Sequence, residues 1–488
     1  MIERLKNMRQ KPGLVVIMVI LLFTLFFSAS NWFRQANLHT SQFDMGNMDQ
    51  TMWHTVHGAV FQMTSPLYPF HQLRTAVHAD YLLLIYAPFY WLWQDPRTML
   101  ILQVIFVATG AIPLYWLARK KVGAWTGVAL VVAYLFYPTL DWAVTFDVHA
   151  VVLVVPLLLW AWWGATEKKW WIYYLAAGLA LLGKEEVGFT VAAMGIYWGW
   201  RRGYRTMGIL SITVGVGWTL LMLGWAIPSA RNVAGHFALD YYSEYGSTFS
   251  EIAKNILVRP WDVARGMFNL DAILLYRSLF APVVGLAIIG LPALLVALPE
   301  VAINLLSNNV NQHTIFFQYM SVIIPIVFIS TIDGIARLRS WMVRHPTQFT
   351  PHRKKVLTWF AVLLGAFAIW VWSPIPGSRH TKDGLAPFVA SPYKVDVQRV
   401  RKMLKADDKV VATNNIVPQF SQRDWIWAFP HDLDKADAIV VLEGGGFEPY
   451  PAEGIAYMVE KLRLDPEWKV EYQHDEFWYF RRTSQRRF

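Results

Sequence analysis

The amino-acid sequence predicts a polytopic α-helical membrane protein, with about 11 spans of the length that crosses a bilayer and a soluble α/β domain at its C-terminal end. Of its 488 residues, 55% are hydrophobic and 16% are charged, and the mean hydropathy is +0.31. Soluble globular chains are about 45–50% apolar and about 25% charged. Apolar runs fill much of residues 14–372, and short basic clusters separate them. Together these observations predict a chain that crosses a bilayer repeatedly.

The predicted spans are apolar runs that approach the roughly 20 residues needed to cross a hydrocarbon core. These runs cover residues 14–30, 99–118, 122–137, 150–165, 170–182, 187–200, 207–227, 319–336 and 356–372. Residues 81–93 are apolar but short and aromatic, so we expect a helix lying at the interface. Residues 279–306 are apolar but interrupted by three prolines. They either re-enter as a hairpin or cross together with residues 266–280.

Basic clusters predict which side of the membrane each loop occupies. Lysine and arginine gather at residues 1–11, 119–121, 167–169, 201–205 and 337–355. Cytoplasmic loops carry such an excess, so we expect a cytoplasmic N-terminus and external loops at residues 31–97 and 228–270. The same clusters account for the net charge of +10. Because they lie between apolar runs instead of forming one face, the charge does not indicate nucleic-acid binding.

The C-terminal segment is no longer membrane-like. Strand patterns occupy residues 409–413, 425–429, 438–442, 468–472 and 477–481, and a helical pattern occupies residues 452–464. This order predicts a small α/β domain, and the number of preceding spans places it outside. The chain is therefore expected to comprise a transmembrane domain, 1–372, and an external domain, 373–488, with a glycine turn at 444–446. It contains no cysteine, which excludes disulfides and thiolate metal sites.

Ionisable residues embedded among the apolar runs fall on the predicted external side. They are Asp44, Asp49, His78, Asp147, His149, Lys184, Glu185, Glu186 and His313. Such groups are unfavourable at a membrane boundary unless they are paired or hydrated. We therefore predict that the segments carrying them line one water-accessible cavity.

Two pairs of these residues have both a chemical and a structural interpretation. Asp44 and Asp49 suit a general base, a metal-binding carboxylate, or a carboxylate that relays a proton to a phosphate. They also suit a helix cap and a solvated loop acid. Their spacing of five does not place them on one helical stripe. Asp147 and His149 could bind a divalent metal together with an acid of the first loop, or could cap a helix at the interface.

The remaining candidates allow similar alternatives. Lys184, Glu185 and Glu186 interrupt an apolar run and could form an internal Lys–Glu pair that lets the chain turn. His313 and Tyr319 could bind a polar head group or could serve only as interfacial residues. Four further histidines of the first loop show no recognisable ligand spacing. They are His39, His54, His57 and His71.

Several motifs occur in a recognisable order. They are Phe-Asp-hydrophobic-Gly-x-x-Asp-Gln at 43–50, an apolar stretch with Pro88, the segment 113–119, Phe-Asp-x-His at 146–149, Lys184-Glu185 and the segment 417–423. Together they resemble the prokaryotic membrane protein family called domain of unknown function 2079. That family is similar in turn to the GT-C glycosyltransferase superfamily, with many spans, a long first external loop that carries an acidic residue, and often an external C-terminal domain. The resemblance implies a multi-pass protein of the prokaryotic plasma membrane.

The resemblance also implies a reaction. A polyprenyl-phosphate sugar would enter from the bilayer, and its sugar would pass with inversion to an unknown acceptor on the external face. Asp44 would take the proton of the acceptor hydroxyl, and Asp49 would support it. Asp147, His149 or Glu185 would position a divalent cation, Mg or Mn, or the departing phosphate. The implied substrate- and phosphate-binding residues are Lys184, Arg74, His78, His313 and Tyr319.

Two other functions fit the same sequence. The proline-interrupted run 279–306 and the intramembrane acids are typical of transporters, so the protein could transport or flip a lipid-linked or small polar substrate. A non-catalytic scaffold for envelope assembly would keep the architecture and tolerate the loss of every acid. A groove open to lipid on one side favours a transferase, and a path that reaches both faces favours a transporter.

Overall fold

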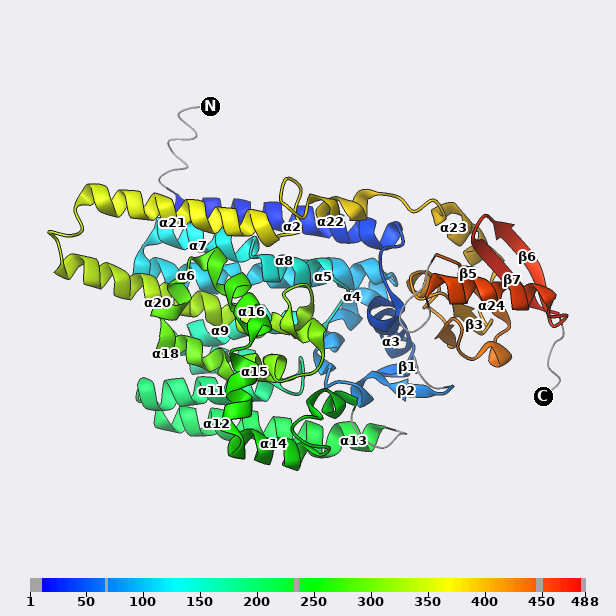
Figure 1. Cartoon of the computed structure of the whole chain (residues 1–488), viewed down its shortest axis with the longest axis horizontal. Helices are drawn as coiled ribbons and strands as arrows, with labels where there is room; N and C mark the ends of the chain where they lie inside the picture. The colour runs from blue at the N-terminus through cyan, green and yellow to red at the C-terminus, as the bar shows by residue number, and fades with distance from the viewer. Residues whose placement is uncertain (1–10, 66–68, 232–236, 445–450, 484–488) are drawn as a thin grey trace. The chain divides into compact units, whose positions relative to one another are not determined.

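The computed structural model describes residues 11–65, 69–231, 237–444 and 451–483 (Figure 1). Residues 1–10 of the predicted basic N-terminus, and residues 445 and 446 of the predicted glycine turn, lie outside these ranges. The chain divides into two compact units. Unit 1 comprises Met1–Ser28, Val77–Leu82 and Gln103–Gly384, and unit 2 comprises Ala29–Ala76, Leu83–Leu102 and Leu385–Phe488.

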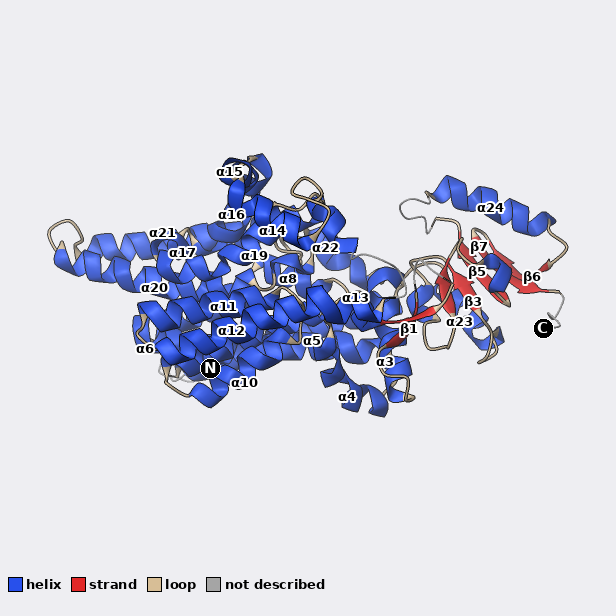
Figure 2. Ribbon diagram, turned by 90° about the horizontal axis from the view of Figure 1, so that it is seen from below, coloured by secondary structure: helices blue, strands red, loops and turns tan. Residues whose placement is uncertain are grey.

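Unit 1 is helical (Figures 1 and 2). Its α-helices are α6 (Ala111–Val122), α7 (Ala124–Leu135), α8 (Pro138–Thr145), α9 (Val154–Thr166), α10 (Trp170–Leu181), α11 (Val187–Ile196), α12 (Arg205–Leu221), α13 (Ile227–Ala230), α14 (Phe249–Val258), α15 (Pro260–Met267), α16 (Leu270–Phe280), α17 (Leu286–Ile289), α18 (Leu291–Leu294), α19 (Leu298–Leu305), α20 (Ile323–Arg344), α21 (Pro351–Trp372) and α22 (Thr381–Leu385). Helices α2 (Pro12–Ala36), α5 (Pro96–Thr109), α22 and η3 (Tyr81–Tyr86) each contribute residues to both units.

Four helical segments in the described part of the chain are long and apolar enough to cross a membrane, or five if the bent pair α7 and α8 counts as one. They are Pro12–Ala36, Pro96–Val122, Arg205–Ala230 and Pro351–Trp372. In α2 and α21, only 22% and 11% of the apolar window is buried inside the protein, against 61% for Pro96–Val122. Extended exposed apolar faces such as those of α2 and α21 require an apolar environment, which a bilayer supplies.

Several predicted elements differ in detail from the structure. The apolar helices Ala150–Thr166 and Trp170–Leu181 belong to the 10–17-residue class. At 1.5 Å per residue they span about 18–26 Å, less than the roughly 30 Å hydrocarbon core. The count of about eleven spans therefore stays a prediction. Residues 138–149 join the predicted spans 122–137 and 150–165, and they are helical for most of their length. Pro138 begins α8 at a position where its missing N–H is not needed. The interruption of 279–306 is confirmed.

Helices α11 and α12 pack closely through glycine. A Cβ atom at Gly195 would lie 2.7 Å from the carbonyl oxygen of Gly208, and one at Gly215 would clash with the carbonyl oxygen of Gly188. Small residues at such positions let two backbones approach, as in the small-x-x-x-small pairs of membrane helices. This packing fixes the start of α11, which directly follows Lys184, Glu185 and Glu186 in the chain.

Unit 2 contains a five-stranded mixed sheet with strand order β4-β3-β5-β7-β6. Its strands are β3 (Val410–Ala412), β4 (Ile426–Ala428), β5 (Ala438–Leu442), β6 (Trp468–His474) and β7 (Phe477–Arg482). Strand β3 pairs in parallel with β4 and β5, and β7 pairs antiparallel with β5 and β6. The five predicted strands and the helix α24 (Ala452–Leu464) are confirmed.

The sheet is covered on both faces because its strands are apolar on both sides. Val411 and Ile439 pack against α24 on one face (Figure 2). Val410 and Val440 face the other core, which also contains Leu38 from the first loop. The first loop therefore contributes directly to the core of the C-terminal sheet.

The first loop supplies most of the remaining elements of unit 2. They are η1 (Gln42–Gly46), α3 (Asn47–Val56), β1 (Gln62–Thr64), β2 (His71–Leu73), η2 (Arg74–Ala76), η3 (Tyr81–Tyr86) and α4 (Ala87–Leu92), with α23 (Lys394–Met403) from the tail. Strands β1 and β2 form an antiparallel pair. The helix predicted at 81–93 is confirmed as η3 and α4, and its place at a membrane interface stays a prediction.

Candidate functional site

The predicted site residues are divided between the two units. Unit 2 holds Asp44, Asp49 and Arg74, and unit 1 holds His78, Asp147, His149, Lys184, Glu185, His313 and Tyr319. Each unit thus has its own cluster of polar residues. The shared cavity expected from the sequence stays a prediction.

Asp49 is a buried carboxylate on α3 whose two oxygens both accept hydrogen bonds. The hydroxyl of Tyr90 donates to Oδ1 at 2.6 Å, and the hydroxyl of Ser421 donates to Oδ2 at 2.6 Å. Gln422 donates from Nε2 to the Tyr90 oxygen at 3.1 Å. Burial raises the pKa of Asp49 to about 7, although the hydrogen bonds from Ser421 and Tyr90 lower it. Asp49 is therefore held in one geometry and titrates near neutral pH.

Asp44 lies five residues earlier, on the π-helical turn η1, and its side chain is partly exposed. This contrast with the buried Asp49 agrees with the expectation that the two acids point in different directions. Gly46 lets the turn pack closely, because a Cβ atom there would lie 3.1 Å from Cγ1 of Val417. Asp44 is thus the accessible acid of the motif and Asp49 is the enclosed one.

Lys184 and Glu185 lie in the turn between α10 and α11, and each is paired with a different partner. Nδ1 of His78 lies 2.8 Å from Oε1 of Glu185, and the backbone N–H of Ala79 donates to Oε2 at 3.0 Å. Nζ of Lys184 lies 2.5 Å from Oε1 of Glu186. The structure therefore brings together His78 and Glu185, two predicted residues far apart in the sequence. It also contains the internal Lys–Glu pair that the sequence allows.

Two further side chains extend this cluster. The ring centroid of Tyr319 lies 5.8 Å from Nζ of Lys184, within cation–π range. Glu300 of α19 is buried and close enough to Lys184 to interact electrostatically. Its Oε2 has no hydrogen-bond partner among the described residues. Glu300 is absent from the predicted site, although an acid inside the apolar run 279–306 is the kind of signal that marks function in membrane proteins.

Asp147 and His149 are both buried and adjacent. Nδ1 of His149 lies 3.1 Å from the backbone oxygen of Asp147, and the backbone N–H of His149 donates to Oε1 of Gln103 at 3.0 Å. The ring of Phe146 stacks on His149 at 5.6 Å. These contacts fix the loop, and in the described part of the chain no third His, Asp or Glu ligand converges on this pair. A divalent cation here stays a prediction.

The other predicted substrate-binding residues lie in well-packed surroundings. Nε2 of His313 lies 2.8 Å from the backbone oxygen of Ser307, and Nδ1 lies 3.8 Å from a carboxylate oxygen of Asp271. Arg74 is buried in η2, and its backbone N–H donates to the Phe61 oxygen at 2.7 Å. A role for either residue in phosphate binding stays a prediction.

Comparison with known proteins gives a family and a fold. The family model described as Predicted membrane protein (DUF2079) matches residues 34–476. No curated protein matches the sequence. Among solved structures, ArnT from Cupriavidus metallidurans in the apo state is similar with 13% identity and a TM-score of 0.51, over 96% of this chain and 97% of that chain. ArnT bound to undecaprenyl phosphate is similar with 12% identity and a TM-score of 0.48, over the same shares.

At this identity the likeness to apo ArnT concerns the fold alone, but it extends over nearly the whole of both chains. It supports the helical membrane fold that the sequence predicts, and the family match confirms the family. The chain therefore belongs to the DUF2079 family of predicted membrane proteins and has a fold similar to that of ArnT.

Proposed function

We propose that the protein is a membrane glycosyltransferase of the GT-C type, which moves a sugar from a polyprenyl-phosphate donor to an acceptor on the external face. The observation that carries the proposal is the pair of acids at 43–50 in a GT-C-like fold. Asp44 is partly exposed, whereas Asp49 is locked by Tyr90 and Ser421. An accessible carboxylate on a turn held by a rigid neighbour suits a general base, which must meet its substrate in a fixed geometry.

In the proposed reaction, the Asp44 carboxylate accepts the proton of the acceptor hydroxyl. The hydroxyl oxygen attacks the anomeric carbon from the side opposite the phosphate. The bond between the anomeric carbon and the phosphate oxygen breaks, and the polyprenyl phosphate leaves with the electron pair, so the configuration inverts. A cation stabilises this developing negative charge. Arg74 is the candidate cation in unit 2. Lys184 is the candidate cation in unit 1, where its ammonium group already forms an ion pair with Glu186.

Metal dependence belongs to the same proposal. A divalent cation, Mg or Mn, would polarise the departing phosphate, and carboxylate and imidazole groups suit such an ion. Asp147, His149 and Glu185 are its candidate ligands, but Glu185 already accepts from Ala79 and pairs with His78. Activity that persists after chelation would remove the cation from the mechanism and leave the proposed base unaffected.

The proposal is tested with the purified full-length protein in detergent and a panel of polyprenyl-phosphate sugars. We expect bound donor and slow hydrolysis, or transfer once an acceptor is found. Asp44→Asn should lower the rate at least about 100-fold, the usual contribution of a general base, while Asp407→Asn, at an exposed acid of the same unit, should leave it unchanged. Full activity of Asp44→Asn contradicts the base assignment. Neither turnover nor binding with any donor contradicts the proposed function.

A transporter is the second candidate, and the buried Glu300 favours it. An intramembrane acid among the broken helices α17, α18 and α19 is typical of an ion or substrate path. Transport moves a substrate without breaking its bonds, so flux in proteoliposomes without any cleaved donor would support it. Loss of that flux in Glu300→Gln would assign the path. A scaffold, by contrast, would keep its cellular role after both Asp44 and Glu300 are replaced.

A further inference from the structure

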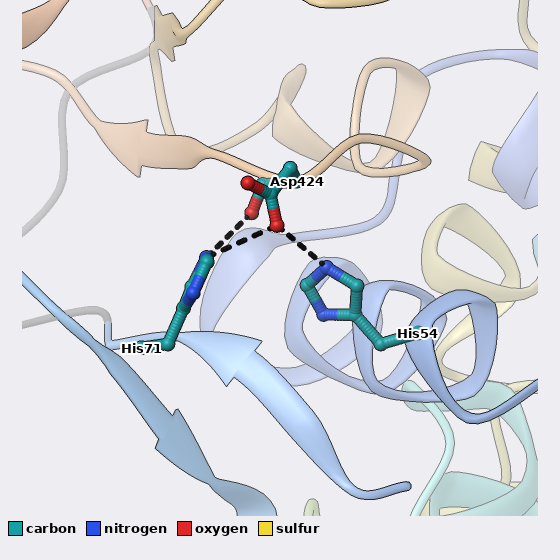
Figure 3. A group of neighbouring side chains, drawn as sticks. All are labelled: His54, His71 and Asp424. Carbon is teal, nitrogen blue, oxygen red and sulfur yellow. Dashed lines mark hydrogen bonds and ion pairs between the residues drawn. The ribbon is translucent and has the colours of Figure 1, made fainter. Parts of the chain in front are cut away.

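Three side chains that the sequence does not group together meet in unit 2 (Figure 3). His54 comes from α3, His71 from β2, and Asp424 from the segment before β4. Nε2 of His54 and Nε2 of His71 each lie 3.4 Å from Oδ1 of Asp424. One ligand atom from each residue lies within 4.8 Å of the other two. In the described part of the chain, this group alone has that property.

The distances between these atoms fit ligands of one ion better than a direct hydrogen bond. Zinc binds imidazole nitrogen and carboxylate oxygen at about 2.0–2.2 Å, so two ligands at the tetrahedral angle lie roughly 3.3–3.5 Å apart. The two separations of 3.4 Å fall in this range. An N–H···O hydrogen bond to the carboxylate would be about 2.9 Å long.

The hydrogen bonding of His54 leaves one ring nitrogen available. Its Nδ1 donates to the backbone oxygen of Gln62 at 2.9 Å, so Nε2 carries a lone pair. Nε2 is buried, has no hydrogen-bond partner among the described residues, and faces Oδ1 of Asp424. Two acceptors, Nε2 of His54 and Oδ1 of Asp424, therefore face each other at 3.4 Å. A cation bound between these two acceptor atoms would give each of them a partner.

His71 is held in place for the same role. Its ring stacks on Trp425 at 3.7 Å, and its Nδ1 lies 2.7 Å from the side-chain amide of Gln62. Its Nε2 also lies 2.9 Å from the backbone oxygen of Asp424. If the proton moves to Nδ1 and the Gln62 amide presents its oxygen, Nε2 becomes free for a metal. Gln62 would then orient both imidazoles, as the outer partners of metal-binding histidines do.

We propose that His54, His71 and Asp424 bind one divalent transition-metal ion of the zinc class. Two imidazoles and one carboxylate match the ligand preference of Zn²⁺, and the side chain of Asp424 is 62% exposed, which leaves a coordination position open to water. The ion would join α3 and β2 of the first loop to the edge strand β4 of the tail sheet. This site is independent of the proposed transfer reaction.

The test uses the full-length protein purified without a histidine tag, stripped with a chelator, and titrated with Zn²⁺. We expect about one tightly bound Zn²⁺ per chain, a higher unfolding temperature with Zn²⁺, and a visible band of tetrahedral Co²⁺ on cobalt substitution. Replacing a ligand, in His54→Ala, His71→Ala or Asp424→Asn, should weaken binding at least about tenfold and abolish the thermal shift.

The matched control is His57→Ala, at the C-cap of α3, with an exposed ring whose Nδ1 donates to the Trp53 oxygen. It should bind Zn²⁺ as the wild type does. If His54→Ala does not fold, Asp424→Asn at the exposed side chain decides the question. Equal Zn²⁺ affinity in wild type and Asp424→Asn, or no tight binding in the wild type, overturns the site.

Discussion

At Asp49, a carboxylate is held away from water by two hydroxyl groups. Tyr90 and Ser421 each donate to one oxygen, yet burial still raises the pKa to about 7. Between about pH 4 and pH 7 the folded protein keeps a proton on Asp49 that the unfolded chain, with an ordinary Asp pKa of about 3.8–3.9, has already lost. The charge of Asp49 is therefore linked to folding.

This linkage predicts a pH dependence. Because the folded pKa is raised, the stabilisation is fully present below about pH 4 and is lost as pH rises to about 7, by up to about 4 kcal/mol. Asp49→Asn should remove this part of the pH dependence between pH 4.5 and 7.5, measured as the free energy of unfolding in detergent. Asp407→Asn, at an exposed acid, should keep the wild-type slope. An unchanged slope in Asp49→Asn would show that Asp49 is ionised throughout.

Residue spacing predicted part of this arrangement. The separation of five between Asp44 and Asp49 correctly indicated two different environments. The partners Tyr90 and Ser421 are 41 and 372 residues away, and no local pattern indicates them. The group of His54, His71 and Asp424 was missed for the same reason, since its third ligand comes from the distant tail.

At the scale of elements, α11 and α12 depend on glycine. Gly188 and Gly215 meet backbone to backbone, so even one methyl group between them clashes. The apolar pattern predicted that both segments are helical, but it carries no information about which face meets which neighbour. Similarly, hydropathy predicted the strands of the tail, whereas the contribution of Leu38 to their core required the structure.

The glycine packing predicts opposite effects for two alanine substitutions in α12. Gly217→Ala has open space around its new Cβ atom and should stabilise the helix by up to about 1 kcal/mol, the usual difference between the two residues. Gly215→Ala should instead destabilise by about 1–3 kcal/mol, because it overpacks the contact with Gly188. Thermal unfolding in detergent measures both changes. Equal effects at the two positions would refute a tight α11–α12 contact.

At the scale of the whole molecule, the compact units do not follow the order of the chain. Unit 2 combines most of the first loop with the tail, and unit 1 contains most of the residues between them. The basic clusters predicted on which side of the membrane each loop of the chain lies. The sequence predicts about eleven spans of bilayer length, whereas four helical segments in the described residues are individually both long and apolar enough to cross a membrane. Helix length in a packed bundle is set by neighbouring helices as well as by lipid, so hydropathy alone does not determine the number of spans.

The predicted topology can be tested because the chain has no cysteine. A single cysteine at Glu460→Cys, on an exposed position of α24, should react with a membrane-impermeant maleimide in intact spheroplasts. Ser340→Cys, exposed near the end of α20, should react only after the membrane is permeabilised. Labelling of both before permeabilisation, or of neither, would contradict the positive-inside assignment.

The hydrogen bond between Asp49 and Ser421 has a consequence for biosynthesis. The two residues are 372 positions apart, and ribosomes add about 5–20 residues per second, so Ser421 is made roughly 20–70 s after Asp49. During that interval the nascent first loop exposes Leu38, and Asp49 lacks its Ser421 partner. Domains usually fold as they emerge, but this one can close only when translation is nearly finished. The first loop can therefore complete its packing only after the tail has been synthesised.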